Sequence, residues 1–157
     1  MLSRLFAVLS LALAAQIAAP MALAQGQNAV SLSGDVQVVR TIEENGTART
    51  VLEPPTQVVP GDRLVFSTSY RNTSGQVVED FVITNPLPAA VVLAENGAFA
   101  VSVDGAKSFG SLASLSVTLE DGATRPAELA DVTHVRWTLD RLEPGASGSV
   151  TYFATIR

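Results

Sequence analysis

The residues that could carry chemistry are few in this sequence. His134 is the only histidine, and the 157-residue chain has no cysteine. A general base would need an orienting carboxylate and a nucleophile such as a serine beside it. Alternation along 133–140 instead predicts that His134 lies on the strand face opposite Val135 and Trp137, next to Arg136. We therefore interpret His134 as a surface residue.

No nucleophile or transition-metal motif stands out. Gly145-Ala146-Ser147-Gly148 lacks the Gly-x-Ser-x-Gly pattern of a nucleophile elbow and is interpreted as a turn. One histidine and no cysteine argue against a zinc or other transition-metal site. Fifteen carboxylates allow too many pairings to indicate a glycoside-hydrolase pair. We expect no catalytic residue, no cofactor and no enzymatic activity.

Calcium is a separate alternative, because it needs only oxygen ligands. Asp104, Asp121 and Asp131 lie in or near predicted loops that could gather at one end of a sheet structure. The chain has no Asp-x-Asp-x-Asp-Gly loop, and aspartate before glycine is ordinary turn chemistry. We assign no metal ligands, and a calcium site in these loops stays open.

The aromatic residues favour packing over ligand stacking. Trp137 lies between Val135 and Leu139 in an alternating strand, which predicts a place in the core. Tyr70 and Tyr152 have the same alternating context and are interpreted in the same way.

The first 24 residues have the pattern of a secretory signal peptide. Arg4 precedes a mostly apolar stretch over Leu5–Ala19, and Ala22-Leu23-Ala24 supplies a small-x-small cleavage pattern. The stretch falls short of the roughly 20 apolar residues that a membrane span needs. We predict cleavage after Ala24, a periplasmic or secreted protein, and no stable membrane anchor afterwards.

The exported part is the size of one domain and acidic. Removal of residues 1–24 takes away one basic residue and no acid, so the net charge of −5 becomes −6. An acidic chain without a basic cluster argues against binding to nucleic acid or anionic membranes. Residues 25–35 are rich in Gln, Asn, Ser and Gly and predict a flexible segment. Residues 36–157 are expected to form one domain.

Period-two alternation with turn residues between the runs predicts an all-β domain. The expected strands are 36–42, 47–52, 63–71, 77–84, 91–95, 98–103, 114–120, 133–140 and 148–156. Asn-Gly, Asp-Gly and Pro-Gly pairs mark the turns between them. One helical turn is expected at 125–129. This spacing predicts an immunoglobulin-like antiparallel β-sandwich, with a small barrel as the alternative.

Several of these motifs together are similar to a known family. Val59-Pro60-Gly61-Asp62, then Tyr70-Arg71-Asn72 and Asn85-Pro86-Leu87-Pro88, precede a closing Leu142-Glu143-Pro144-Gly145. In order and spacing the region from about residue 58 to 156 resembles the DUF11 conserved-repeat domain of bacterial secreted and cell-surface proteins. The resemblance implies an immunoglobulin-like sandwich that serves as a spacer or adhesive module, with no catalytic residue.

We therefore predict a non-enzymatic structural or interaction module of the bacterial cell envelope, with an envelope protein or polymer as its partner. A partner strand could add to an exposed edge of one of the long regular strands, Arg63–Arg71 or Gly148–Ile156. The alternative is a periplasmic carbohydrate- or small-ligand-binding module that uses the loops around Asp104 and Asp121.

Overall fold

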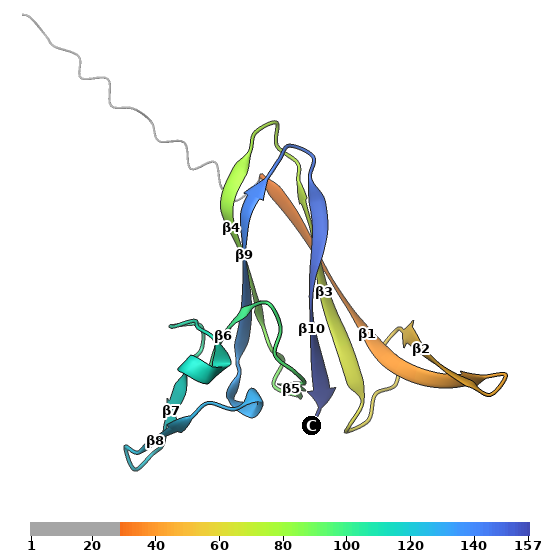
Figure 1. The fold of residues 1–157 in the computed structure, drawn as a ribbon, viewed down its shortest axis with the longest axis vertical. Helices are drawn as coiled ribbons and strands as arrows, with labels where there is room; N and C mark the ends of the chain where they lie inside the picture. Colours follow the sequence, from red (N-terminus) through yellow and green to blue (C-terminus); the bar gives the residue numbers. More distant parts are fainter. Residues whose placement is uncertain (1–28) are drawn as a thin grey trace, which may run out of the picture.

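The computed structural model describes residues 29–157 as an all-β domain built from antiparallel sheets (Figure 1). The predicted signal peptide, residues 1–24, lies outside the described residues. Within 29–157 no helix is long and apolar enough to cross a membrane. The all-β sandwich class predicted from the alternation is confirmed.

Two sheets of unequal width make up the sandwich. The wider sheet has the strand order β2-β1-β3-β10-β5. Its strands are β1 (Val30–Glu44), β2 (Thr47–Glu53), β3 (Arg63–Asn72), β5 (Val91–Leu93) and β10 (Ser147–Ile156). The narrower sheet has the order β4-β9-β6, from β4 (Val78–Pro86), β9 (His134–Leu142) and β6 (Ala100–Ser102). The separation of the five-stranded sheet from the three-stranded sheet favours the sandwich over the barrel.

Short elements lie between β6 and β9 of the narrower sheet. A small hairpin pairs β7 (Ser116–Thr118) with β8 (Thr124–Pro126), and two 3-10 turns cover Leu112–Ser114 and Leu129–Asp131. The helical turn expected at 125–129 is therefore misplaced: residues 124–126 are strand, and the turn begins at Leu129. Pro126 fits this edge strand because it is paired on one side only.

The core lies where alternating side chains of both sheets meet. Trp137 is 9 % exposed, its ring centroid 5.4 Å from that of Phe99 and 6.3 Å from that of Tyr152. Tyr152 in turn stacks on Phe66 with a centroid separation of 4.8 Å. Such aromatic pairs contribute about 0.5–1.5 kcal/mol each beyond their buried area. The predicted core positions of Trp137 and Tyr152 are confirmed, and Tyr70 is partly buried against the same core.

The structure corrects the start of the domain. Residues 25–35 were expected to be flexible, but Val30–Asp35 belong to β1 and pair with β3 from Asn72 to Ser67. The polar composition misled the prediction because Ser31, Ser33 and Asp35 lie on exposed strand positions. A strand that faces water on one side carries polar residues there at no cost.

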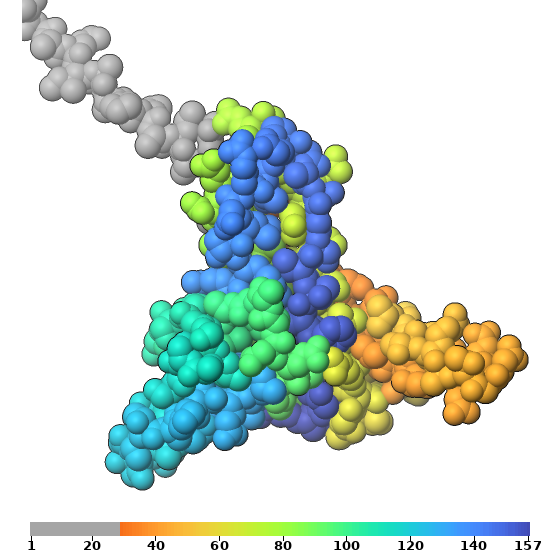
Figure 2. All heavy atoms as spheres, viewed as in Figure 1, coloured from red at the N-terminus to blue at the C-terminus, as the bar shows by residue number. Residues whose placement is uncertain are grey.

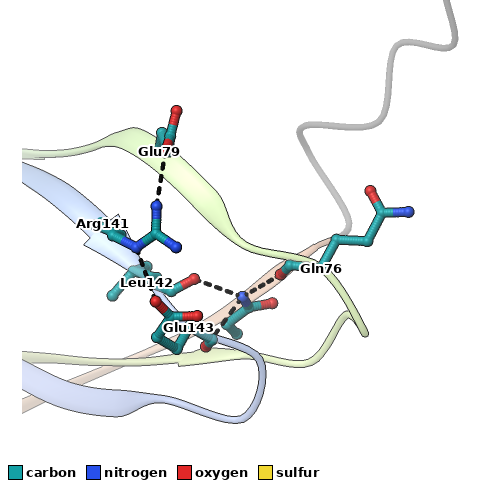
Figure 3. Close-up of polar contacts among 6 residues, drawn as sticks. Gln76, Glu79, Arg141, Leu142 and Glu143 are labelled. Atoms are coloured by element: carbon teal, nitrogen blue, oxygen red, sulfur yellow. Dashed lines mark hydrogen bonds and ion pairs between the residues drawn. The ribbon is translucent and has the colours of Figure 1, made fainter.

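Asn72 joins two chain reversals at one end of the sandwich. Its side chain is fully buried, and its amide nitrogen donates to the carbonyl oxygens of Gln76 at 2.8 Å, Leu142 at 3.0 Å and Glu143 at 3.2 Å. Its amide oxygen accepts from the backbone N–H and hydroxyl of Ser74. Figure 3 shows the carbonyl groups of Gln76, Leu142 and Glu143 directed toward one nitrogen atom between them. The β3–β4 turn is thus fastened to the β9–β10 turn.

Replacement of Asn72 by alanine should destabilise the domain by about 3 kcal/mol, because it leaves buried carbonyl groups without donors. Urea unfolding followed by circular dichroism measures this loss. Thr73→Ala is the matched control: the Thr73 hydroxyl makes one exposed hydrogen bond, to the carbonyl oxygen of Ala29. Equal stability of both variants would contradict the central role of Asn72.

Candidate functional site

The first candidate site is an open strand edge on β10. Of the two long strands expected to offer an edge, β3 is paired on both sides, with β1 and with β10, so that expectation is wrong for Arg63–Arg71. β10 is paired with β3 along its length, but β5 covers only its end, Ala154–Ile156. Residues 147–152 therefore have no neighbour on that side within the described chain.

Two hydrogen bonds establish which backbone groups of β10 point to the open side. The Asn72 N–H donates to the Ala146 carbonyl at 2.8 Å, and the Ala94 N–H donates to the Phe153 carbonyl at 2.9 Å. Antiparallel ladders alternate sides residue by residue. The N–H and C=O groups of Ser147, Ser149 and Thr151 therefore point away from β3, and the side chains of these three residues are exposed.

The open edge of β10 ends before Phe153. Beyond Thr151, the Phe153 carbonyl is already occupied by the Ala94 N–H. The Arg63 guanidinium covers the Phe153 ring at 4.5 Å and forms an ion pair of 2.8 Å with Glu95. These contacts cover the outward ring of Phe153 and leave space for one short added strand alongside 147–152.

The second candidate site is a groove on the opposite flank of the sandwich. Part of the inward face of β1 is uncovered: Gly34 is exposed, whereas Val30 and Val38 on the same face are buried. Leu32 on this face is 50 % exposed. The groove has a volume of about 440 Å³, and its walls include Gly34, Asp35, Val36, Phe66, Thr68, Asn85 and Tyr152.

The polar groups of the groove are already positioned. The Asn85 amide nitrogen donates to the Thr68 hydroxyl at 2.7 Å, and the Tyr152 hydroxyl lies 3.5 Å from the Pro86 carbonyl. Burial raises the pKa of Tyr152 to about 12, so the phenol stays protonated and is no base near neutral pH. A mostly apolar floor with the Asn85 amide and Asp35 on its walls suits a partly apolar molecule that carries hydrogen-bonding groups.

The three aspartates that were expected to gather at one end of the sheets each form hydrogen bonds within their own loop. The Asp104 carboxylate accepts from the hydroxyls of Ser102 at 2.7 Å and Ser108 at 2.6 Å. Asp121 accepts from the Ala123 N–H, and Asp131 is held by both terminal guanidinium nitrogens of Arg125 at 2.7 Å. Residues 29–157 contain no group of three or more acidic or histidine side chains that could hold a metal ion. The loops therefore offer no assembled ligand set.

His134 lies on the outward face of β9, as the alternation predicts. Its Nδ1 is 3.0 Å from the Thr133 hydroxyl, and no carboxylate hydrogen-bonds to the ring in the described chain. The neighbouring Arg136 stacks on Phe109 at 3.4 Å and donates to the Thr84 hydroxyl. This part of the face is built for packing and shows no acid–base arrangement.

The groove was not predicted from the sequence. Gly34 was assigned to a flexible segment, whereas it lies in β1 opposite Thr68 and lines the groove. The alternation of Val30, Leu32, Gly34 and Val36 was the available signal, since it continues the inward face of β1 without a break.

Comparison with known proteins adds no relative. The chain matches no protein-family model, and neither the curated proteins nor the solved structures contain a significant match to it.

Three aspartates should make stability depend on acid pH. Hydrogen bonds lower the pKa of Asp104, chiefly from the Ser108 hydroxyl, and the guanidinium groups of Arg40 and Arg125 lower the pKa values of Asp62 and Asp131. A lowered folded-state pKa stabilises the fold above the unfolded value of about 3.9, and this stability is lost as the pH falls toward the folded value. We expect Asp104→Asn to lose less stability between pH 6 and pH 3 than the parent in urea titrations. Identical losses would show that Asp104 contributes nothing to acid unfolding.

Proposed function

We propose that this protein is a non-enzymatic interaction module of the bacterial cell envelope, periplasmic or secreted, that binds an extended segment of a partner protein by adding it as a strand to β10. The observation that carries the proposal is the open edge at 147–152, where three residues direct their backbone groups outward. Main-chain hydrogen bonds are the basis of affinity in this mode of recognition.

The sequence supports the proposed location of the protein and the class of its partner. The pattern over residues 1–24 is typical of exported proteins, and the similarity to DUF11 domains implies a spacer or adhesive role at the cell surface. The acidic charge is compatible with a protein partner and disfavours nucleic acid.

The geometry also limits the partner segment. Pairing is possible along 147–152 and ends at Phe153, so the added strand is about six residues long. Its side chains alternate between the flank of the core and solvent, which calls for alternating apolar and polar residues. Half-buried Val150, which packs against the core cluster, lies on the inward side of this edge.

The groove supports a second candidate function, the binding of a carbohydrate or other small ligand. The observation that favours it is the combination of an apolar floor with the Asn85 amide in a hollow of about 440 Å³. The loops around Asp104 and Asp121, which the sequence predicted for this function, line neither this groove nor the neighbouring hollow beside Leu32 and Tyr70.

Ser149→Pro should weaken partner binding and leave the domain folded. Proline removes an N–H that points to the open side and disturbs no β3 pairing. We expect the dissociation constant for the partner segment, identified by affinity purification and made as a peptide, to rise about tenfold. Val150→Pro is the matched control, because its N–H belongs to the ladder with β3 and its loss should unfold the sheet.

Hydrogen exchange gives a second readout of strand addition. The amides of Ser147, Ser149 and Thr151 should become protected when the peptide binds, whereas inward amides of β10 are protected beforehand. Unchanged affinity of the Ser149→Pro variant, or unchanged exchange at these amides, would rule out strand addition at β10.

Gly34→Leu should fill the groove without disturbing the sheet. A Cβ atom at Gly34 meets nothing within 4 Å, and replacing glycine in a strand stabilises by about 0.5–1 kcal/mol. Thermal-shift screening of neutral sugars and small apolar ligands should show stabilisation of the parent and none of the variant. Ligand shifts of equal size in both proteins would place binding elsewhere.

A further inference from the structure

A second interaction surface lies on the arm formed by β1 and β2. The last third of β1, beyond Val39, leaves the sandwich and pairs with β2 alone, so a two-stranded ribbon projects into solvent (Figure 2, orange to yellow). Residues 41–50 are exposed throughout, and Leu52 is 51 % exposed. An isolated two-stranded ribbon is marginally stable in water. The arm therefore gains from a further strand.

The base of the arm is rigidly held. The Arg40 guanidinium forms a 2.6 Å ion pair with Asp62 and donates to the Gln57 carbonyl at 3.1 Å. Asp62 also accepts from the Val59 N–H. The segment that returns from β2 to β3 thus braces the base of the arm at Arg40.

The hydrogen-bonding pattern of β1 establishes which backbone groups of β2 are unpaired. The Thr73 N–H donates to the Ala29 carbonyl, so odd-numbered residues of β1 bond to β3 and even-numbered residues bond to β2. Arg49 and Val51 lie opposite Ile42 and Arg40 and are therefore used within the arm. The N–H and C=O groups of Ala48, Thr50 and Leu52 point to the open side.

The charged side chains of β2 are arranged so that two copies of the strand can complement each other. Arg49 and Glu53 lie on the same face of β2, with Val51 midway between them. When two copies of β2 pair antiparallel about Val51, Arg49 of each copy lies opposite Glu53 of the other. The same register pairs Thr50 with Leu52, two residues whose backbone groups are free, and ends at Pro54, which has no N–H to donate.

We propose that β2 is a homodimerisation edge: two copies of the chain pair β2 with β2 about Val51, joined by reciprocal Arg49–Glu53 ion pairs. The neighbouring register, centred on Thr50, places Arg49 opposite Val51 and leaves both charges without a partner. Within one chain Arg49 makes only a loose 3.4 Å contact with Glu44, and both side chains are about 60 % exposed. Arg49 is therefore available to a second copy.

The free edge of β1 is the competing partner for β2. Beyond Val39 it offers the short stretch up to Glu44, with Glu43 and Glu44 adjacent. Pairing of β2 with that edge would be head-to-tail and would build open filaments instead of a closed dimer. The two arrangements use different acids, Glu53 in the dimer and Glu44 in the filament, and so can be separated by mutation.

Charge reversal tests the dimer. Such a strand-edge contact falls in the small, weak class of interfaces, so we expect dissociation between about 10 μM and 1 mM by sedimentation equilibrium. Arg49→Glu and Glu53→Arg, each alone, should be monomeric over this range. An equimolar mixture of the two variants should restore the dimer, and so should the double variant that carries both changes.

Glu44→Gln is the control, since it removes the acid of the filament arrangement and should leave the dimer intact. Circular dichroism checks that every variant is folded. A parent protein that is monomeric at 1 mM, a dimer indifferent to both charge reversals, or filaments sensitive to Glu44→Gln would each overturn the proposal.

Discussion

The buried side chain of Asn72 is the constraint on which the arrangement of the two sheets depends. Its amide satisfies carbonyl groups from the β3–β4 turn and from the β9–β10 region at once, so one residue fixes both chain crossings between the sheets. Its backbone N–H and C=O are bonded to Ala146 and Gly145 as well. A fully satisfied buried amide favours one arrangement of the sheets over sliding alternatives, because any slip would leave polar groups unpaired.

Both candidate sites result from the unequal widths of sheets held in this way. The narrower sheet leaves the inward face of β1 uncovered around Gly34, and the groove lies there. With β5 reduced to three residues, the greater part of the β10 edge has no neighbour. The groove offers the Asn85 amide, the Tyr152 hydroxyl and the Asp35 carboxylate to a bound molecule, and the strand edge offers backbone amides and carbonyls.

The sequence predicted most of the strands because the period of two is a local property. Val135 and Trp137 alternate with His134 and Arg136, and the structure places the first pair in the core and the second outside it. The openness of an edge is a nonlocal property: the regular pattern of Arg63–Arg71 could not reveal that β1 and β10 flank it. The groove was missed for the same reason, since it depends on how many strands the opposite sheet has.

The two proposed contacts lie toward opposite edges of the wider sheet. In the order β2-β1-β3-β10-β5, pairing through β2 joins two copies into one continuous sheet and leaves each β10 edge at a far end. A dimer of this kind presents two strand-binding edges related by a two-fold axis. Two weak contacts to one partner then act together, since the second forms at the high effective concentration set by the first. A short strand edge with modest affinity would in this way hold an envelope partner that repeats along a surface.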